Sequence, residues 1–227
     1  MYHNNTELIV MLTHNDYTVE NAYRIFDECK NSKAGIWGLK EDGLSLGQMK
    51  ILYANMKKYG KTTVLEAIAY TEEKCMKAAE MAVECGCNIL MGTIFFDSVN
   101  EFCKENKLKY MPFVGKVTER PSVLEGTIEG MIDEANKYIE KGVYGIDLLA
   151  YRYTGDTAAL IEKFASQVNA PVCLAGSINS YKRLDEVKKT DLWAFTIGGA
   201  FFENKFGQTH SEQINRVCEY IKNTNIA

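Results

Sequence analysis

Short apolar segments alternate along the chain with longer amphipathic segments, eight times in succession. The apolar segments have the length of β-strands and lie near residues 7–13, 34–40, 62–68, 88–94, 109–116, 143–149, 171–176 and 193–198. The segments between them carry apolar residues at the i, i+3, i+4 spacing of a helix with one buried face, near residues 18–31, 46–59, 72–85, 98–106, 127–141, 157–168, 180–189 and 210–223. Strict alternation of strands and helices predicts a parallel sheet covered by helices.

The number of strand–helix units predicts how this sheet is arranged. Eight units within 227 residues favour a closed (β/α)8 barrel, the TIM barrel, over an open doubly wound sheet. No GxGxxG segment follows the first strand, as a dinucleotide-binding sheet would require. The chain has only three Pro and no low-complexity segment, so we expect residues 1–227 to form a single α/β barrel domain.

A faint internal repeat links the two halves of the chain. Residues 89–97, at the end of the fourth predicted strand, resemble residues 195–203, at the end of the eighth. The similarity suggests duplication of a half-barrel. Two buried strands with similar needs for apolar residues would also look alike, and this alternative stays open.

Two glycine-bearing turns follow the last two predicted strands. Gly176 and Ser177 come after the seventh strand, and Gly198 and Gly199 come after the eighth. Glycine has no Cβ, so an anion can approach the backbone N–H groups of such turns closely. In a TIM barrel, the loops after strands seven and eight frequently bind phosphate. We therefore expect these four residues to bind a phosphate group; ordinary strand-to-helix turns are the alternative.

These turns resemble the phosphate-binding half of the ribulose-phosphate-binding barrel superfamily. The segments Ala175–Ile178 and Ile197–Phe206 are most similar to the histidine-biosynthesis isomerase and the N-acylmannosamine-6-phosphate epimerase. The resemblance implies a phosphorylated ligand and leaves the reaction open. The chain departs from these families elsewhere: Leu65–Ile68 stands where the isomerase has a second glycine-rich turn, so we do not expect a second phosphate site there. The isomerase's catalytic aspartate pair is also missing, and Ala175 replaces a glutamate expected of the epimerase.

Side-chain alternation selects candidate catalytic residues on three strands. Successive side chains of a strand point to opposite faces, so apolar neighbours that face the helices turn Lys40, Glu66 and Asp147 into the barrel. Charged groups are costly to bury without a partner, which favours function for the two carboxylates. His14, in the loop after the first strand, is a further candidate base, with a loop or turn residue as the alternative.

The same reasoning on the fifth strand selects a second lysine. If Met111 and Phe113 face the helices, Lys116 points into the barrel mouth. Lys116 and Lys40 would then lie at the same barrel mouth as catalytic cations. The alternatives are that they are solvated charges at the rim or ion-pair partners of the carboxylates. Two loops at this mouth carry an arginine that could contact substrate: Arg120 in residues 118–126, and Arg152 between two tyrosines in residues 151–156.

Composition limits the partners, the compartment and the cofactors that we expect for this protein. The net charge of −4 argues against a nucleic-acid partner. Seven Cys without a CxxC pair suggest reduced thiols in a cytoplasmic protein, and we find no signal peptide and no apolar run long enough to span a membrane. The chain has only three His, and no two of them have the close spacing of zinc ligands, which argues against a zinc site. We therefore expect no metal and no cofactor, with a carboxylate-bound Mg²⁺ left open; a homo-oligomer is compatible with the sequence.

These residues predict an enzyme that acts on a phosphorylated sugar or ketose. The first hypothesis is an isomerase or epimerase, in which Glu66 and Asp147 transfer a proton next to a carbonyl and Lys40 or Lys116 polarises it. The alternative is a Schiff-base aldolase or lyase, with Lys116 as nucleophile and its pKa lowered by the other lysine. A non-catalytic barrel that binds a phosphorylated ligand, or one of the antiterminator type, is the third hypothesis.

Overall fold

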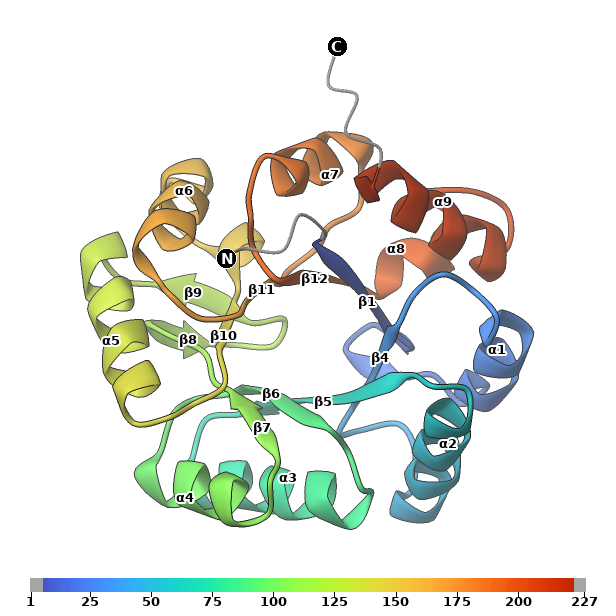
Figure 1. The fold of residues 1–227 in the computed structure, drawn as a ribbon, viewed down its shortest axis with the longest axis horizontal. Coiled ribbons are helices and arrows are strands. Elements are labelled where there is room, and N and C mark those ends of the chain that lie inside the picture. Colours follow the sequence, from blue (N-terminus) through green and yellow to red (C-terminus); the bar gives the residue numbers. More distant parts are fainter. Residues whose placement is uncertain (1–5, 223–227) are drawn as a thin grey trace.

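The strands form a ring of parallel neighbours that is surrounded by helices (Figure 1). A computed structural model describes residues 6–222 of the chain. The ring has the strand order β10-β11-β12-β1-β4-β5-β6-β7. Its members are β1 (Glu7–Met11), β4 (Ile36–Lys40), β5 (Thr62–Ala69), β6 (Ile89–Thr93), β7 (Lys109–Met111), β10 (Ile146–Leu148), β11 (Val172–Leu174) and β12 (Ala194–Ile197).

Backbone hydrogen bonds close the ring between β7 and β10. The Tyr144 N–H donates to the Tyr110 carbonyl at 2.9 Å, and the Asp147 N–H donates to the Pro112 carbonyl at 3.0 Å. The eight strands therefore form a barrel, and the predicted (β/α)8 fold is confirmed. Strands β6 and β12, which carry the internal repeat, lie four positions apart in the strand order, as a half-barrel repeat requires. Duplication itself stays a prediction.

Helices cover the outside of the barrel, and at least one helix follows each strand of the ring (Figure 1). Several begin at a side chain that caps the free N–H groups of the first turn: Ser45 does so for α2 in a capping box, and Asp156 for α6. The helices are α1 (Ala22–Cys29), α2 (Leu46–Lys58), α3 (Glu72–Glu84), α4 (Asp97–Glu105), α5 (Ile128–Glu140), η1 (Ala150–Arg152), α6 (Thr157–Gln167), α7 (Tyr181–Lys188), α8 (Gly199–Phe202) and α9 (His210–Lys222).

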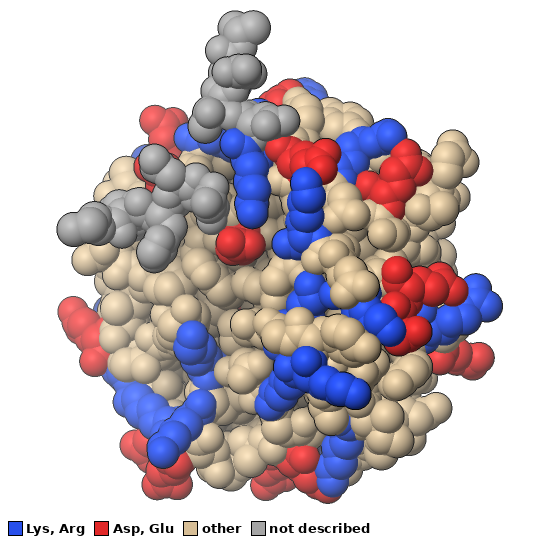
Figure 2. Space-filling view, turned by 45° about the vertical axis from the view of Figure 1, so that its right-hand side comes forward, with Lys and Arg blue, Asp and Glu red and all other residues tan. Residues whose placement is uncertain are grey.

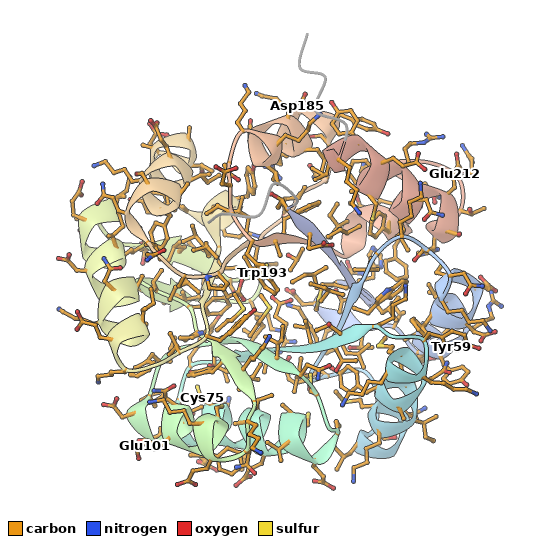
Figure 3. The ribbon with its side chains drawn as sticks, viewed as in Figure 1. Tyr59, Cys75, Glu101, Asp185, Trp193 and Glu212 are labelled. Carbon is orange, nitrogen blue, oxygen red and sulfur yellow. The ribbon has the colours of Figure 1, made fainter. Side chains whose placement is uncertain are left out.

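Apolar side chains fill two separate layers. One layer lies between the strands and the helices, and the other fills the inside of the barrel with Ile9, Met11, Ile36, Val64, Ile89, Met91, Met111, Cys173 and Ala194. Tyr144 and Trp193 pack against the inner layer just before β10 and β12, with their rings 6.0 Å apart. Trp193 accordingly lies near the middle of the ring in Figure 3. These two rings pack at the amino ends of β10 and β12, and the cavity described below opens at the carboxyl ends of the strands.

Two small hairpins interrupt the predicted pattern. The hairpin of β2 (Thr13–His14) and β3 (Tyr17–Thr18) takes up the start of the predicted first helix, which begins at Ala22 instead of residue 18. The hairpin of β8 (Lys116–Thr118) and β9 (Val123–Glu125) follows β7, which ends at Met111 instead of residue 116.

The described surface carries charges of both signs. Lys and Arg side chains are interspersed with Asp and Glu over the face shown in Figure 2, in keeping with a net charge of −4. All seven cysteines are free and buried. Within residues 6–222, we find no helix whose length and apolar character would let it cross a membrane.

Candidate active site

A cavity of about 280 Å³ opens at the carboxyl ends of the strands. TIM-barrel enzymes build their active sites at this end of the barrel. The lining comes from several strand ends and the loops after them, and includes Thr13, His14, Asp16, Lys40, Glu66, Pro121, Ser122, Arg152, Gly176, Ser177, Gly198, Gly199 and Glu203. The predicted site residues from the beginning, middle and end of the chain are thus largely brought together in one place.

The structure places Lys40, Glu66 and Asp147 inside the barrel, as side-chain alternation predicts. Their exposed fractions are 6%, 8% and 1%, and their strand neighbours pack in the outer apolar layer. Lys40 and Glu66 line the cavity, whereas Asp147 lies buried without lining it. The three groups nevertheless interact electrostatically. Their catalytic roles stay predictions.

Lys40 is held between carboxylates. Its Nζ lies 2.7 Å from Asp16 Oδ1 and 3.9 Å from Glu66 Oε1. Burial acts to lower the pKa of Lys40, but the Glu66, Asp16 and Glu41 carboxylates together outweigh burial, so the pKa is raised above its ordinary value. Lys40 is therefore a fixed positive charge at neutral pH.

Asp147 is a carboxyl group buried inside the barrel. Neither of its side-chain oxygens has a partner among the described residues. Burial and, after it, the negative charge of Glu66 raise the pKa of Asp147 well above its ordinary value, and the Lys40 charge offsets only part of this. Cys173, the inward residue beside Asp147 in the register of β10 and β11, offers no charge to compensate. Asp147 is thus placed to hold a proton.

The expected inward position of Lys116 is wrong. Lys116 lies on β8, where its side chain is 71% exposed and its Nζ donates to Glu125 Oε2 at 2.8 Å. The hydrogen bond to Glu125 raises the pKa of Lys116. Met111 belongs to the inner layer, opposite to our expectation, and Gly115 turns the chain out of the sheet with a φ of +71°. The idea that two lysines at one mouth lower each other's pKa therefore has no basis in the structure.

The two glycine turns line the same cavity. Gly176 and Ser177 have successive positive φ values of +93° and +58°, and Gly198 immediately precedes the short helix α8. The turn after β11 is separated from α7, which begins at Tyr181, so Gly176 is not at a helix N-terminus. Arg183 donates to the Ser177 carbonyl and holds this turn in place. The arrangement leaves both turns facing the cavity, with phosphate binding still a prediction.

The two candidate arginines differ in what they contact. Arg152 packs over Gly176, where an added Cβ would lie 2.7 Å from the Arg152 Cγ, and its guanidinium makes no ion pair or hydrogen bond within the described part of the chain. Arg120 lies outside the cavity lining and is already engaged: its Nη1 lies 3.0 Å from Asp42 Oδ2, and its Nη2 donates to the Asp16 carbonyl at 2.8 Å. Arg152 is therefore the arginine available to a ligand.

Arg120 instead fastens the hairpin loop beside the cavity. Its guanidinium stacks on the Tyr17 ring at 5.2 Å. On the other side of the loop, Tyr70 Oη donates to the Glu119 carbonyl at 2.9 Å and lies 2.8 Å from Ser122 Oγ. Pro121 and Ser122, at the tip, line the cavity. The contacts of Arg120 position this wall of the cavity and do not reach into it.

His14 lines the cavity on β2, with its ring stacked on Phe202 at 5.5 Å. Asp16, two residues further, is not among the residues that the sequence selects, although it makes the shortest ion pair of Lys40. Its sequence signal is weak: an Asn-Asp pair after a strand, which also suits a tight turn. Asn15 and Asp16 do form that turn, with φ values of +51° and +64°.

Within residues 6–222, no group of three or more His, Cys, Asp or Glu side chains is arranged to hold a metal ion. Two carboxylates at the cavity, Asp16 and Glu66, already contact the Lys40 ammonium. Lys40 therefore provides the positive charge that these two carboxylates face.

Comparison with known proteins identifies the fold. No protein-family model matches the chain, and no curated protein matches its sequence. Among solved structures, N-(5'-phosphoribosyl)anthranilate isomerase from Pyrococcus furiosus has a TM-score of 0.67 and 11% identity, over 97% of this chain and 100% of that one. The tryptophan synthase alpha chain from Legionella pneumophila has a TM-score of 0.65 and 14% identity, over 98% and 94%. N-acetylmannosamine-6-phosphate 2-epimerase from Clostridium perfringens has a TM-score of 0.63 and 12% identity, over 86% of each chain. The chain shares the TIM-barrel fold of these proteins.

Proposed function

We propose that this protein is an isomerase or epimerase that moves a proton next to the carbonyl of a phosphorylated sugar or ketose. The observation that carries the proposal is the arrangement of one cavity: the Lys40–Glu66 pair lines it from β4 and β5, and the two glycine turns line it from the ends of β11 and β12, on the other side of β1 in the strand order. Such a cavity can hold a phosphate at one end and a carbonyl at the other. The similar folds of an isomerase and an epimerase that act on phosphorylated compounds are consistent with this class.

Glu66 is the proposed base. It faces the cavity from β5, and a carboxylate there can accept the proton next to the substrate carbonyl. In an isomerisation it returns this proton to the neighbouring carbon, while the hydroxyl proton of that carbon passes to the former carbonyl oxygen. Lys40 is the proposed electrophile, because its charge is fixed and lies 3.9 Å from Glu66, beside the place where the intermediate's oxygen would become negative. The negative charge then moves from Glu66 to the substrate and stays near the same cation.

Asp147 is the proposed proton store behind Glu66. Its raised pKa favours the protonated form, and Glu66 is the carboxyl group of the two that lines the cavity. Two carboxyl groups with different environments can divide the acid and base roles between them. Because Asp147 does not line the cavity and its oxygens contact no hydrogen-bond partner among the described residues, we propose that it exchanges its proton with Glu66 through a bridging water and does not touch the substrate directly.

The phosphate end is proposed to comprise Gly176, Ser177, Gly198 and Gly199, with Arg152 as the cation. Backbone N–H groups of glycine turns suit the oxygen atoms of a phosphate, and Arg152 has no competing acidic partner among the described residues. Gly199 is the most open of these positions, since a Cβ there would meet nothing closer than His14 Cδ2 at 3.7 Å.

The test is a screen of aldose and ketose monophosphates in D₂O, followed by proton NMR. We expect one of them to be converted to an isomer or epimer with deuterium incorporated next to the carbonyl. Binding of a monophosphate without any conversion or exchange would contradict the proposal and favour a non-catalytic binding barrel. Cleavage of a carbon–carbon bond would favour the lyase alternative.

A further inference from the structure

The two ends of the cavity differ in the availability of their positive charges. At the glycine end, the guanidinium of Arg152 makes no ion pair with any residue that the structure describes. At the other end, Lys40 is neutralised by Asp16 at 2.7 Å and lies 3.9 Å from Glu66. Glu203, the carboxylate that lines the cavity beside Gly199, is paired with Lys205 at 3.5 Å, so Arg152 stays available to an anion at the glycine end. The other end has no cation to spare among the described residues.

The hairpin wall adds no free positive charge to that second end. Arg120 Nη1 lies 3.0 Å from Asp42 Oδ2 and 3.6 Å from Glu41 Oε1. Its other amino group donates to the Asp16 carbonyl. Carboxylates thus outnumber the cations around this end of the cavity, and Asp147 lies buried beyond them.

We infer that the substrate carries a single phosphate and that its reacting end is uncharged, with hydroxyl groups around the carbonyl. This inference rests on the proposed function, because it takes the Lys40–Glu66 end to be the reacting end. A second phosphate there would meet Asp16 and Glu66 in a partly dehydrated space, and like charges repel strongly in such surroundings. Hydroxyl groups, in contrast, can donate hydrogen bonds to both carboxylates.

This charge balance is compatible with the proposed reaction. When Glu66 accepts the substrate proton it becomes neutral, and the negative charge appears on the substrate oxygen beside Lys40. The total charge at this end is the same before and after the transfer. A substrate that is anionic here from the start adds a charge that no cation of residues 6–222 compensates.

The experiment compares a ketopentose 5-phosphate with its 1,5-bisphosphate by calorimetry at fixed ionic strength. We expect the monophosphate to bind and the bisphosphate to bind at least about tenfold more weakly. The Asp16→Asn variant removes one carboxylate and frees Lys40, so we expect it to reduce this difference. Glu125→Gln, which alters the exposed pair with Lys116 outside the cavity, is the matched control and should leave the ratio unchanged.

Equal or tighter binding of the bisphosphate by the wild type would overturn the inference. A wild-type preference for the monophosphate that persists in Asp16→Asn would overturn it too. The bisphosphate would then be rejected because of its size and not because of its charge. Binding does not depend on proton exchange, so the proposed function fails separately, when the monophosphate binds but no proton is exchanged. Failure of both ligands to bind would overturn both proposals.

Discussion

Asp147→Asn should change how the stability of the protein depends on pH. The Asp147 carboxyl is fully buried, its oxygens have no partner among the described residues, and its pKa in the folded protein is raised well above the ordinary value of 3.8 by burial and by Glu66. Between pH 3.8 and the raised pKa, the folded chain therefore holds a proton that the unfolded chain has lost. Unfolding releases this proton, so the free energy of unfolding falls as the pH rises through this window.

The magnitude follows from the linkage relation. One proton released on unfolding lowers the free energy of unfolding by about 1.4 kcal/mol per pH unit, and this is the upper limit for one group. An asparagine amide cannot titrate, so the variant lacks this contribution. The free energy of unfolding of the variant minus that of the wild type should rise by up to about 1.4 kcal/mol per pH unit above about pH 4. This difference should become constant once the pH passes the raised pKa of Asp147.

Urea denaturation at half-unit pH intervals measures this difference without any knowledge of the substrate. Only the slope against pH is informative, because the buried amide of the variant adds a constant term of its own. Asp133→Asn, at an exposed position of α5, is the reference for the same chemical change elsewhere. A difference between the Asp147→Asn variant and the wild type that does not vary with pH would refute the assignment of Asp147 as a proton-holding group.

Three further predictions concern the lysines and the glycine turn. Lys40→Met leaves two carboxylates without their cation and should lower the free energy of unfolding by about 3 kcal/mol, measured by urea denaturation. Lys116→Met removes only an exposed ion pair and should leave the free energy of unfolding unchanged. Equal effects of the two substitutions would contradict the structure. Treatment with borohydride and a substrate that the enzyme converts should give no stable adduct in intact-mass spectra, because Lys40 is charged and Lys116 lies outside the cavity. An adduct that is lost in Lys40→Met or in Lys116→Met would support the aldolase alternative. Gly199→Val should raise KM for the phosphorylated substrate at least tenfold with little loss of stability; an unchanged KM would argue against phosphate at this turn.

Sequence alternation predicted the inward side chains wherever a strand runs unbroken to the cavity. The strands β4 and β5 extend through Lys40 and Glu66, and β10 surrounds Asp147, so counting residues in steps of two gives the correct face. The apolar neighbours on each strand pack in the outer layer and fix this register.

The same counting failed on the fifth strand because the strand ends early. Beyond Met111, Pro112 has no N–H for a sheet, and Gly115 turns the chain with a positive φ. Alternation therefore has no meaning between residues 111 and 116. The assignment of Met111 to the side that faces the helices was also wrong, since Met111 fills the barrel interior.

Long-range partners were beyond the sequence pattern. Asp16 contacts Lys40 across 24 residues of chain, and Arg120 reaches the Asp16 carbonyl across 104. No local spacing connects such residues, and both lie in turns whose composition suits an ordinary loop. The glycine turns were easier to find because their residue types and their position after the last two strands are local features.

The turnover of Glu66→Gln tests the central claim most directly. The measurement is kcat on the phosphorylated sugar found by the screen, with binding of the same compound determined separately by calorimetry. We expect a fall in kcat of about 10²–10⁴-fold, the usual range for loss of an acid–base group, with binding retained. Turnover close to that of the wild type would contradict the assignment of Glu66 as the base and, with it, the proposed chemistry of the cavity.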